Sequence, residues 1–314
     1  MLKKEIETVE DPDLDPAQMR SSVEGFSIEA LPRDAKRIGD FREHLPAGTL
    51  VYVGWAPNTD IDEIVRAAAK LSRQGMTPVP HIAARRIPSE RILWDLVGEL
   101  VGDAGVRRLL MLGGDPNPPE GPYSDTFSIL TSGVLQEFGV GEIGIAAHPE
   151  GHPAVDEETL EQALQDKVSA ASRAGVGVHA VTQFTLVPRV VRRWYSDVYR
   201  NVAGHTPLRI GIPGIVSKKT LVKLAWACGV SGSLDIVRKN GGRVASAAGT
   251  SRTARMVAEL SSLVDDPGAG QLAGFHFYPF GNFEKTAAWA CAVADGNFAL
   301  HEGEPRIAEA ASGN

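Results

Sequence analysis

The sequence predicts an α/β protein that folds as a (β/α)8 barrel, with an extra helical segment before the last strand. Three observations lead to this fold class. Short apolar runs alternate with helical patterns along most of the 314 residues, eight such runs occur, and polar residues close several of them. Alternating strands and helices give parallel strands whose carboxyl ends gather on one face. An open doubly wound sheet is the alternative, because the sequence does not show whether the sheet closes.

The predicted strands are apolar runs, several of which stop at proline or glycine. Pro32 stops the first run, and Pro213-Gly214 stops the seventh. We expect strands at residues 26–31, 49–53, 77–83, 107–112, 142–147, 176–184, 208–212 and 272–278.

Segments with apolar residues at helical spacing separate these strands. In the first of them, Ile61, Ile64, Val65 and Leu71 share one face of the predicted helix. The predicted helices span residues 60–73, 89–100, 123–137, 156–174, 187–202, 217–228, 233–239, 250–263 and 282–293. The helices at 233–239 and 250–263 make up the extra segment, because together they break the simple strand-helix alternation.

The pattern divides the chain into three regions. Residues 1–20 are polar, and we expect a loose N-terminal arm or a short helix there. Residues 21–301 form the barrel, which would be the catalytic domain. Residues 302–314 are small and polar, and we expect a flexible tail that frays at its end.

Composition excludes several functional classes. The net charge of −7 disfavours nucleic acid or an anionic membrane as the main partner. Cys228 and Cys291 form no CxxC pattern, so we expect neither a disulfide framework nor a structural zinc site, which fits a reducing compartment. No apolar run reaches the ~20 residues that span a bilayer, and residues 1–15 do not resemble a signal peptide. The sequence therefore predicts a cytoplasmic protein.

Four polar residues follow strand-like runs and would meet on one face of the barrel: Glu29, His81, Asp115 and Gln183. A carboxylate among apolar neighbours has a raised pKa and can act as a general acid, which is the functional interpretation of Glu29. A solvated glutamate paired with a nearby arginine is the alternative. His81 is either a site residue or a satisfied core histidine. The amide of Gln183 suits the edge of a pterin or purine, but it could equally bond to the backbone.

Two loops carry further candidate residues. In Gly113-Gly114-Asp115-Pro116, the glycines let the backbone approach a ligand closely, although the same residues also favour an ordinary turn. The loop His148-Pro149-Glu150-Gly151-His152-Pro153 is irregular because of its prolines. His and Glu there could ligate a metal, but we favour a polar ligand and expect no metal site. Neither a P-loop nor a GxGxxG motif is present.

Short motifs from the first strand to the last carry a family resemblance. They are Phe26-Ser27-Ile28-Glu29 with Pro32, Pro80-His81, Gly114-Asp115-Pro116, His148-Pro149-Glu150-Gly151-His152-Pro153, Ala174-Gly175 with Thr182-Gln183-Phe184, Ile212-Pro213-Gly214-Ile215, and Gly274-Phe275-His276-Phe277-Tyr278. They come in family order over residues 25–295. On these residues the sequence resembles the methylenetetrahydrofolate reductase family, whose members are flavin-dependent (β/α)8 barrels.

The resemblance implies a reaction and roles for several residues. NADH or NADPH would reduce FAD, and the flavin would reduce 5,10-methylenetetrahydrofolate to 5-methyltetrahydrofolate. Glu29 matches the glutamate that protonates the folate, and Asp115 matches the aspartate near pterin and flavin. The remaining matches are cofactor-binding positions at His81, Gly113, Gly114, His148 and His152, and substrate-binding positions at Gln183, Phe184 and Tyr278. A barrel of this family without a further domain is also expected to pair with itself, as a homodimer.

The sequence departs from the family pattern at flavin positions. Gly113 stands where an arginine is usual, His148 where a tyrosine is usual, and Gly54 where a threonine is usual. The usual lysine before Ala174-Gly175 is missing, so Lys167 or Arg173 would take its role. Weak FAD binding, or direct hydride transfer from NAD(P)H without flavin, is therefore an alternative. A barrel lyase or aldolase and a non-catalytic folate-binding barrel are two others.

Overall fold

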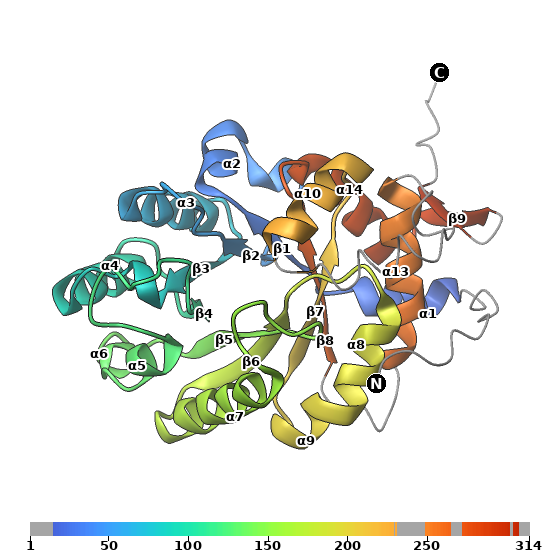
Figure 1. Cartoon of the computed structure of the whole chain (residues 1–314). Coiled ribbons are helices and arrows are strands. Elements are labelled where there is room, and N and C mark those ends of the chain that lie inside the picture. The colour runs from blue at the N-terminus through green and yellow to red at the C-terminus, as the bar shows by residue number, and fades with distance from the viewer. Residues whose placement is uncertain (1–14, 229, 231–248, 265–271, 302–303, 308–314) are drawn as a thin grey trace.

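The protein is a closed barrel of eight parallel strands surrounded by helices, as the computed structural model shows (Figure 1). The structure describes residues 15–228, 230, 249–264, 272–301 and 304–307. The first strand pairs with the last, Ser27 with His276 and Ile28 with Phe277, so the sheet closes. The predicted (β/α)8 barrel is confirmed, and the open doubly wound sheet is excluded.

Each barrel strand lies within three residues of its predicted bounds, because each apolar run is a buried parallel strand. The strands are β1 (Ser27–Ala30), β2 (Leu50–Val53), β3 (Thr77–Ala83), β4 (Arg108–Leu112), β5 (Glu142–Ala147), β6 (Gly177–Thr182), β7 (Leu208–Pro213) and β8 (Leu272–Tyr278). Neighbours along the chain pair with each other in the barrel.

The helices follow the strands in the expected alternation. They are α2 (Pro32–Arg37), α3 (Ile61–Arg73), α4 (Glu90–Gly102), α5 (Thr126–Leu130), α6 (Val134–Glu137), α7 (Glu157–Arg173), α8 (Pro188–Trp194), α9 (Arg200–Val202), α10 (Lys218–Ala227), α13 (Gly249–Val264) and α14 (Phe283–Ala294). Short 3-10 turns occupy Phe41–Glu43 and Ala84–Arg86, and a π-helical turn at Tyr195–Tyr199 joins α8 to α9.

The single helix predicted over residues 123–137 is wrong. The structure has two short helices there, α5 and α6, because Gly133 adopts a left-handed conformation with φ of 86° and interrupts the helical hydrogen bonding. Of the extra helical segment, α13 confirms the prediction for residues 250–263. The helix predicted at 233–239 lies outside the described residues.

Both ends of the chain add structure to the barrel. Helix α1 (Pro16–Val23) packs against α13 and α14, so the N-terminal arm is partly helical and extends past residue 20. Strands β9 (Phe298–His301) and β10 (Glu304–Ile307) pair antiparallel. This hairpin corrects the expectation of a loose tail starting at residue 302. The apolar run at Phe298 was missed because it gains strand structure only by pairing with β10.

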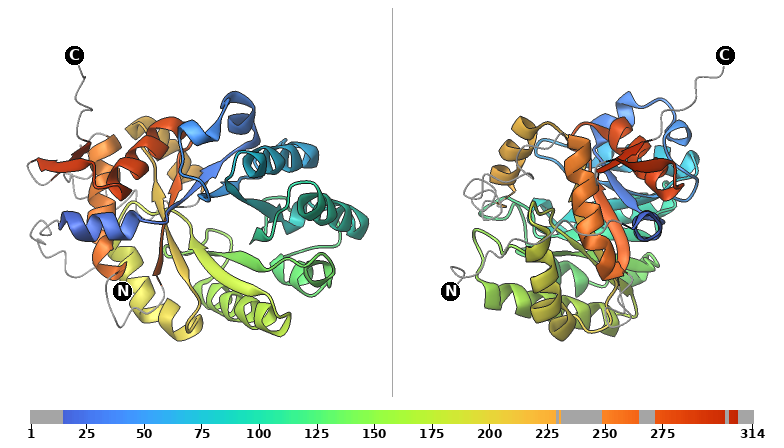
Figure 2. Two further views of the ribbon diagram at one scale, coloured as in Figure 1. Left: turned by 180° about the vertical axis from the view of Figure 1, so that it is seen from behind. Right: turned by 90° about the vertical axis from the view of Figure 1, so that its right-hand side faces the viewer.

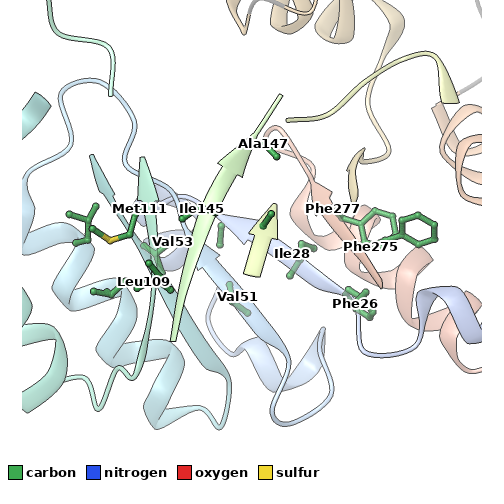
Figure 3. Packing of buried hydrophobic residues seen from close by; sticks show 14 of the residues in the cluster. Phe26, Ile28, Val51, Val53, Leu109, Met111, Ile145, Ala147, Phe275 and Phe277 are labelled. Carbon is green, nitrogen blue, oxygen red and sulfur yellow. The ribbon is translucent and has the colours of Figure 1, made fainter. Parts of the chain in front are cut away.

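Strand residues alternate between the barrel interior and the helices. Figure 3 shows the outward set, which includes Ile28, Val51, Val53, Phe275 and Phe277, all of them fully buried. Because successive side chains in a strand point to opposite faces, the residues between them point into the barrel. The interior positions therefore include Glu29, Tyr52, His276 and Tyr278.

The barrel interior toward the amino-terminal ends of the strands is polar rather than aliphatic. The Tyr52 hydroxyl lies 2.7 Å from His179 Nε2, and His179 Nδ1 lies 2.6 Å from Glu142 Oε1. Arg108 Nε donates to the other oxygen of Glu142 at 2.7 Å. Hydrogen bonding from His179 lowers the pKa of Glu142 to about 2, against the effect of its burial. Tyr52 and His179 are buried, whereas Glu142 and Arg108 are partly exposed, and the contacts among the four side chains connect the interior to the solvent at this end of the barrel.

Candidate active site

The candidate site lies at the carboxyl ends of the barrel strands, where Glu29 points into the mouth from β1. Its side chain is 18% exposed. Burial raises the pKa of Glu29 to about 7, and the negative charge of Asp34 adds to the rise. The alternative of a solvated glutamate paired with Arg33 or Arg37 is wrong: among the described residues the basic side chain within 4 Å of Glu29 is His81, and Arg37 pairs with Glu284 and Asp34. Glu29 can therefore hold a proton near neutral pH and release it to a ligand in the mouth.

His81, on β3, faces Glu29 inside the barrel. Its Nε2 lies 3.9 Å from Glu29 Oε2, and this nitrogen is buried without a hydrogen-bond partner among the described residues. Burial lowers the pKa of His81 to about 3, so the imidazole is neutral. A neutral imidazole nitrogen can accept a hydrogen bond from a protonated carboxyl group, which makes the pair chemically matched once the gap closes.

The departure from the family pattern at Gly54 has a steric cause. A Cβ atom at Gly54 would lie 2.6 Å from Leu31 Cδ2 and 3.3 Å from the Glu29 carboxyl carbon. Leu31 directly follows β1, between Ala30 and Pro32. The absence of a side chain at position 54 therefore leaves room for the side chains of Leu31 and Glu29, so the residue at position 54 and these two side chains depend on one another.

Asp115 follows β4 and lies on the same face of the barrel, but its charge is already paired. Arg86 Nη2 lies 2.8 Å from Asp115 Oδ2, and the Asp115 side chain is 80% exposed. Arg86 also donates to the carbonyl of Ala56, so one cation joins the loops after β2, β3 and β4. Sequence reasoning missed this role of Arg86, which it had not assigned to the site.

The thiol of Cys228 connects the two candidate carboxylates. Burial raises the pKa of Cys228 to about 11, and the charges of Glu29 and Asp115 both add to the rise. Glu29 lies near the carboxyl end of β1 and Asp115 follows the carboxyl end of β4, and in a parallel barrel these ends lie on one face. The two carboxylates that the sequence singles out therefore share one mouth.

Aromatic residues next to Gln183 line another part of the mouth. Gln183 Oε1 accepts the backbone N–H of Phe184 at 3.0 Å, so half of its amide is used within the chain. The Tyr278 hydroxyl donates to the carbonyl of Thr182 at 3.0 Å. The ring of Phe184 packs against Tyr278 and Phe280, with ring centroids 6.1 and 5.1 Å apart.

Helix α10 packs on this aromatic group instead of on the outside of the barrel. Leu221 and Ala225 of α10 are buried in one cluster with Phe184, together with Tyr278 and Phe280. The helix that packs against β7 and β8 is α13. In the right-hand view of Figure 2, α13 (orange) runs along the barrel while α10 (gold) lies apart from it. The sequence predicted both helices but not that α10 covers the mouth.

The predicted cofactor residues after β5 form a cluster with Lys167 of α7. The rings of His148 and His152 lie 5.4 Å apart. Burial lowers the pKa of His148 to about 4, and the charges of His152 and Lys167 lower it further. Burial also lowers the pKa of Lys167, while the charge of Asp125 opposes that shift.

Two other predicted cofactor residues, Arg173 and Gly113, show no such cluster in the structure. Arg173 is exposed in the last turn of α7, four residues before β6 begins, so it lies at the opposite end of the barrel from Gln183. Of the two cations considered for this role, Lys167 is the one whose charge acts on His148. A Cβ atom at Gly113 would meet nothing within 4 Å, so packing does not require a glycine there.

Within the described ranges, no group of three His, Cys, Asp or Glu side chains could hold a metal ion. No helix in the same part of the chain is both long and apolar enough to cross a membrane.

Comparisons with known proteins agree with the motifs. The sequence model of the family described as methylenetetrahydrofolate reductase matches residues 35–289. A 5,10-methylenetetrahydrofolate reductase from Pectobacterium carotovorum subsp. carotovorum is 28% identical over 113 residues, which are 36% of this chain and 35% of that protein. The matched stretch thus spans about a third of that relative. A solved structure from Clostridium thermocellum, an uncharacterized protein that binds two copies of 5-methyl-5,6,7,8-tetrahydrofolic acid, superposes with a TM-score of 0.57. It is 16% identical, covering 90% of this chain and 98% of that one, and shows the shared fold.

Proposed function

The chain belongs to the methylenetetrahydrofolate reductase family, and we propose that it reduces 5,10-methylenetetrahydrofolate to 5-methyltetrahydrofolate with NADH or NADPH. The observation that carries the proposal is Glu29, a carboxyl group with a pKa of about 7 at the mouth of the barrel. The methyltetrahydrofolate bound by the Clostridium thermocellum protein supports a folate as the ligand of this fold.

In this proposal Glu29 acts as the general acid. The reaction adds one hydride and one proton to the methylene-bridged folate, so a proton donor is required in every turnover. Glu29 gives its proton to the folate ring nitrogen that leaves the methylene carbon, and the five-membered ring opens to an iminium ion. The carboxylate that remains lies beside the developing cation and stabilises it. His81, uncharged and buried, adds no opposing positive charge next to the iminium.

Gln183 and the residues around it hold the pterin in this proposal. The Gln183 side chain offers donor and acceptor groups at the mouth, and its position is fixed by the bond to Phe184. The Tyr278 phenol stays neutral, because burial raises its pKa well above the ordinary value. A neutral, aromatic wall suits the flat and uncharged pterin ring better than a charged one.

The residues at the end of β5 fit a flavin cofactor. Lys167 is a half-buried cation next to His148 and His152, and such a group favours an anionic phosphate as its partner. These three residues, with the backbone of Gly113 and Gly114, would hold FAD. When bound, FAD would take the hydride from NAD(P)H and deliver it to the folate.

The proposal predicts a specific pH dependence of NADH oxidation by the purified protein with FAD and methylenetetrahydrofolate. Glu29 must be protonated to act, so kcat/KM is expected to be level below about pH 7 and to fall tenfold per pH unit above it. Product formation without nicotinamide oxidation would instead indicate a lyase or aldolase. Folate binding with no turnover at any pH would indicate a non-catalytic folate-binding barrel.

Flavin-independent reduction is the second candidate, favoured by the glycine at position 113 and by the loss of the usual lysine. The absorption spectrum of the purified protein, with and without added FAD, separates the two. With FAD as cofactor, we expect flavin absorption bands that remain after gel filtration, and activity that disappears when the flavin is removed. A colourless protein that stays fully active would assign direct hydride transfer from NAD(P)H to the folate.

A further inference from the structure

The amino-terminal face of the barrel, opposite the candidate site, carries two arginines whose side chains point inward. Arg108 begins β4, and Arg209 is the second residue of β7. Arg108 alternates with Leu109, which belongs to the outward set of Figure 3. Arg209 alternates with Ile210, which pairs with the outward-facing Phe275. Branched aliphatic side chains ordinarily fill the interior of such a barrel, so guanidinium groups at one end of it call for an explanation.

The carboxylate beside these arginines is already fully engaged. Glu142 begins β5, and it accepts from Arg108 at 2.7 Å and lies 2.6 Å from His179 through its other oxygen. Arg209 is half-buried and donates to the carbonyl of Gly25 at 3.0 Å. Among the described residues, no carboxylate lies within 4 Å of the Arg209 nitrogens. This end of the interior therefore holds more positive than negative charge.

A cavity of about 490 Å³ opens at the same face, between the starts of β3, β4 and β5. Its charged lining consists of Arg107, Arg108 and Glu142, which are two cations and one anion. The cavity is thus net positive, although the whole chain has a net charge of −7. Its volume falls in the range of about 300–1,000 Å³ that is typical of ligand pockets.

Folding explains only part of this arrangement. The bond between Arg108 and Glu142 ties β4 to β5, which is a structural role. Arg107 is exposed and donates to the carbonyl of Val106, its own neighbour, so it joins no other element through that bond. The exposed carboxylates of Glu24 and Asp103 end α1 and α4 at this face. In the described ranges neither lies within 4 Å of a basic nitrogen, so they do not form ion pairs with the arginines.

We propose that this cavity is a binding site for a phosphate group, held by Arg107 and Arg108. A guanidinium presents a planar fork of N–H donors that matches two phosphate oxygens. Arg108 uses Nε for Glu142, which leaves its two Nη groups for the ligand. The Glu142 carboxylate lines the cavity and opposes an anion, but Arg108 and His179 offset its charge.

The electrostatics of Arg209 agree with an anion at this face. Burial lowers the pKa of Arg209, and the positive charge of Arg108 lowers it further, against the effects of Tyr52 and Glu142. A phosphate beside Arg108 would reduce this repulsion between guanidinium groups. The cavity has room for more than one phosphate group, so free phosphate and an organic phosphate monoester share the required chemistry.

The test is calorimetric titration of the full chain with inorganic phosphate and with glycerol 3-phosphate, at constant ionic strength. Arg107→Gln removes one exposed ion pair and should weaken phosphate binding by about 1.5- to 5-fold, with a smaller loss at high salt. Glu142→Gln removes the opposing charge at nearly constant shape, so it should tighten binding by a similar factor. Arg66→Gln, which removes the same charge from α3 away from the cavity, is the matched control and should leave the affinity unchanged.

The opposite signs expected for Arg107→Gln and Glu142→Gln separate a binding site from a structural network, since loosening of this face would weaken binding in both variants. Tighter binding of glycerol 3-phosphate would assign an organic phosphate to the cavity, and tighter binding of inorganic phosphate would assign the free ion. The inference is overturned if the unsubstituted protein binds neither, or if Arg107→Gln and Arg66→Gln have equal affinities. Phosphate bound at Lys167 in the mouth would ignore both cavity variants and would overturn it too. None of these results depends on folate reduction, so the proposed function is tested separately.

Discussion

Replacing Glu29 by glutamine is expected to remove most of the turnover and, at the same time, to stabilise the protein at pH 8. Glutamine has nearly the shape of glutamate but cannot donate an acidic proton. Loss of a general acid typically lowers the rate by about 10²- to 10⁴-fold. Binding of folate and nicotinamide should stay within a few-fold of normal, since the shape of the mouth is unchanged.

The gain in stability follows from the raised pKa of Glu29. The folded protein binds this proton more tightly than the unfolded chain, because burial raises the pKa from 4.5 to about 7. Stability is therefore lost as the pH rises from about 4.5 to 7, and the full loss is present above pH 7. For a side chain that is 18% exposed, the loss is roughly 2–3 kcal/mol. Glutamine carries no charge at any pH, so the substitution removes this loss.

Thermal unfolding of Glu29→Gln and of the unsubstituted protein at pH 4 and pH 8 measures the effect. The difference in melting temperature should be small at pH 4 and clearly positive at pH 8. Glu43→Gln, a change at an exposed glutamate, is the control and should shift neither melting temperature nor activity. Full activity in Glu29→Gln would end the assignment of the acid, and an unchanged stability difference between the two pH values would contradict its buried state.

The parts of this protein that the sequence predicted best are those that depend on local patterns. Each barrel strand is a short apolar run, and the alternation along it settles which residues face the interior. Glu29 is an example: it lies between outward-facing Ile28 and Ala30, so a strand at this place must turn the carboxylate inward. Burial then raises its pKa, as the apolar neighbours in the sequence indicate.

The parts that the sequence missed depend on contacts between distant residues. Arg86 neutralises Asp115 across 29 positions, and no local pattern selects that arginine over Arg85. Both α10 and α13 are amphipathic, so periodicity cannot tell which one packs against β7 and which one covers the mouth. The interior hydrogen bond between Tyr52 and His179 joins β2 to β6, and each residue alone resembles a core side chain. Long-range packing decides all three.

Substitution of Gly211 by alanine is expected to be strongly destabilising and to disturb the substrate side of the mouth. Gly211 lies on β7, and an added Cβ would stand 2.4 Å from the carbonyl oxygen of Thr182 and 2.8 Å from the Tyr278 ring. The carbonyl belongs to the neighbouring strand and cannot rotate away. Overpacking of this kind typically costs about 1–3 kcal/mol, and the backbone contact places this case at the upper end.

The expected result for Gly211→Ala is a melting temperature lower by roughly 3–5 °C, with a raised KM for the folate. The raised KM follows because relief of the contact must move β6, which carries Gln183 at its end, or the Tyr278 ring. Gly102→Ala is the matched control: Gly102 ends α4, and its added Cβ would meet nothing within 4 Å. That change should leave stability equal or raise it by up to about 1 kcal/mol, because alanine favours the helix. If Gly211→Ala melted at the same temperature as the control, β6, β7 and Tyr278 could not be packed as closely as described.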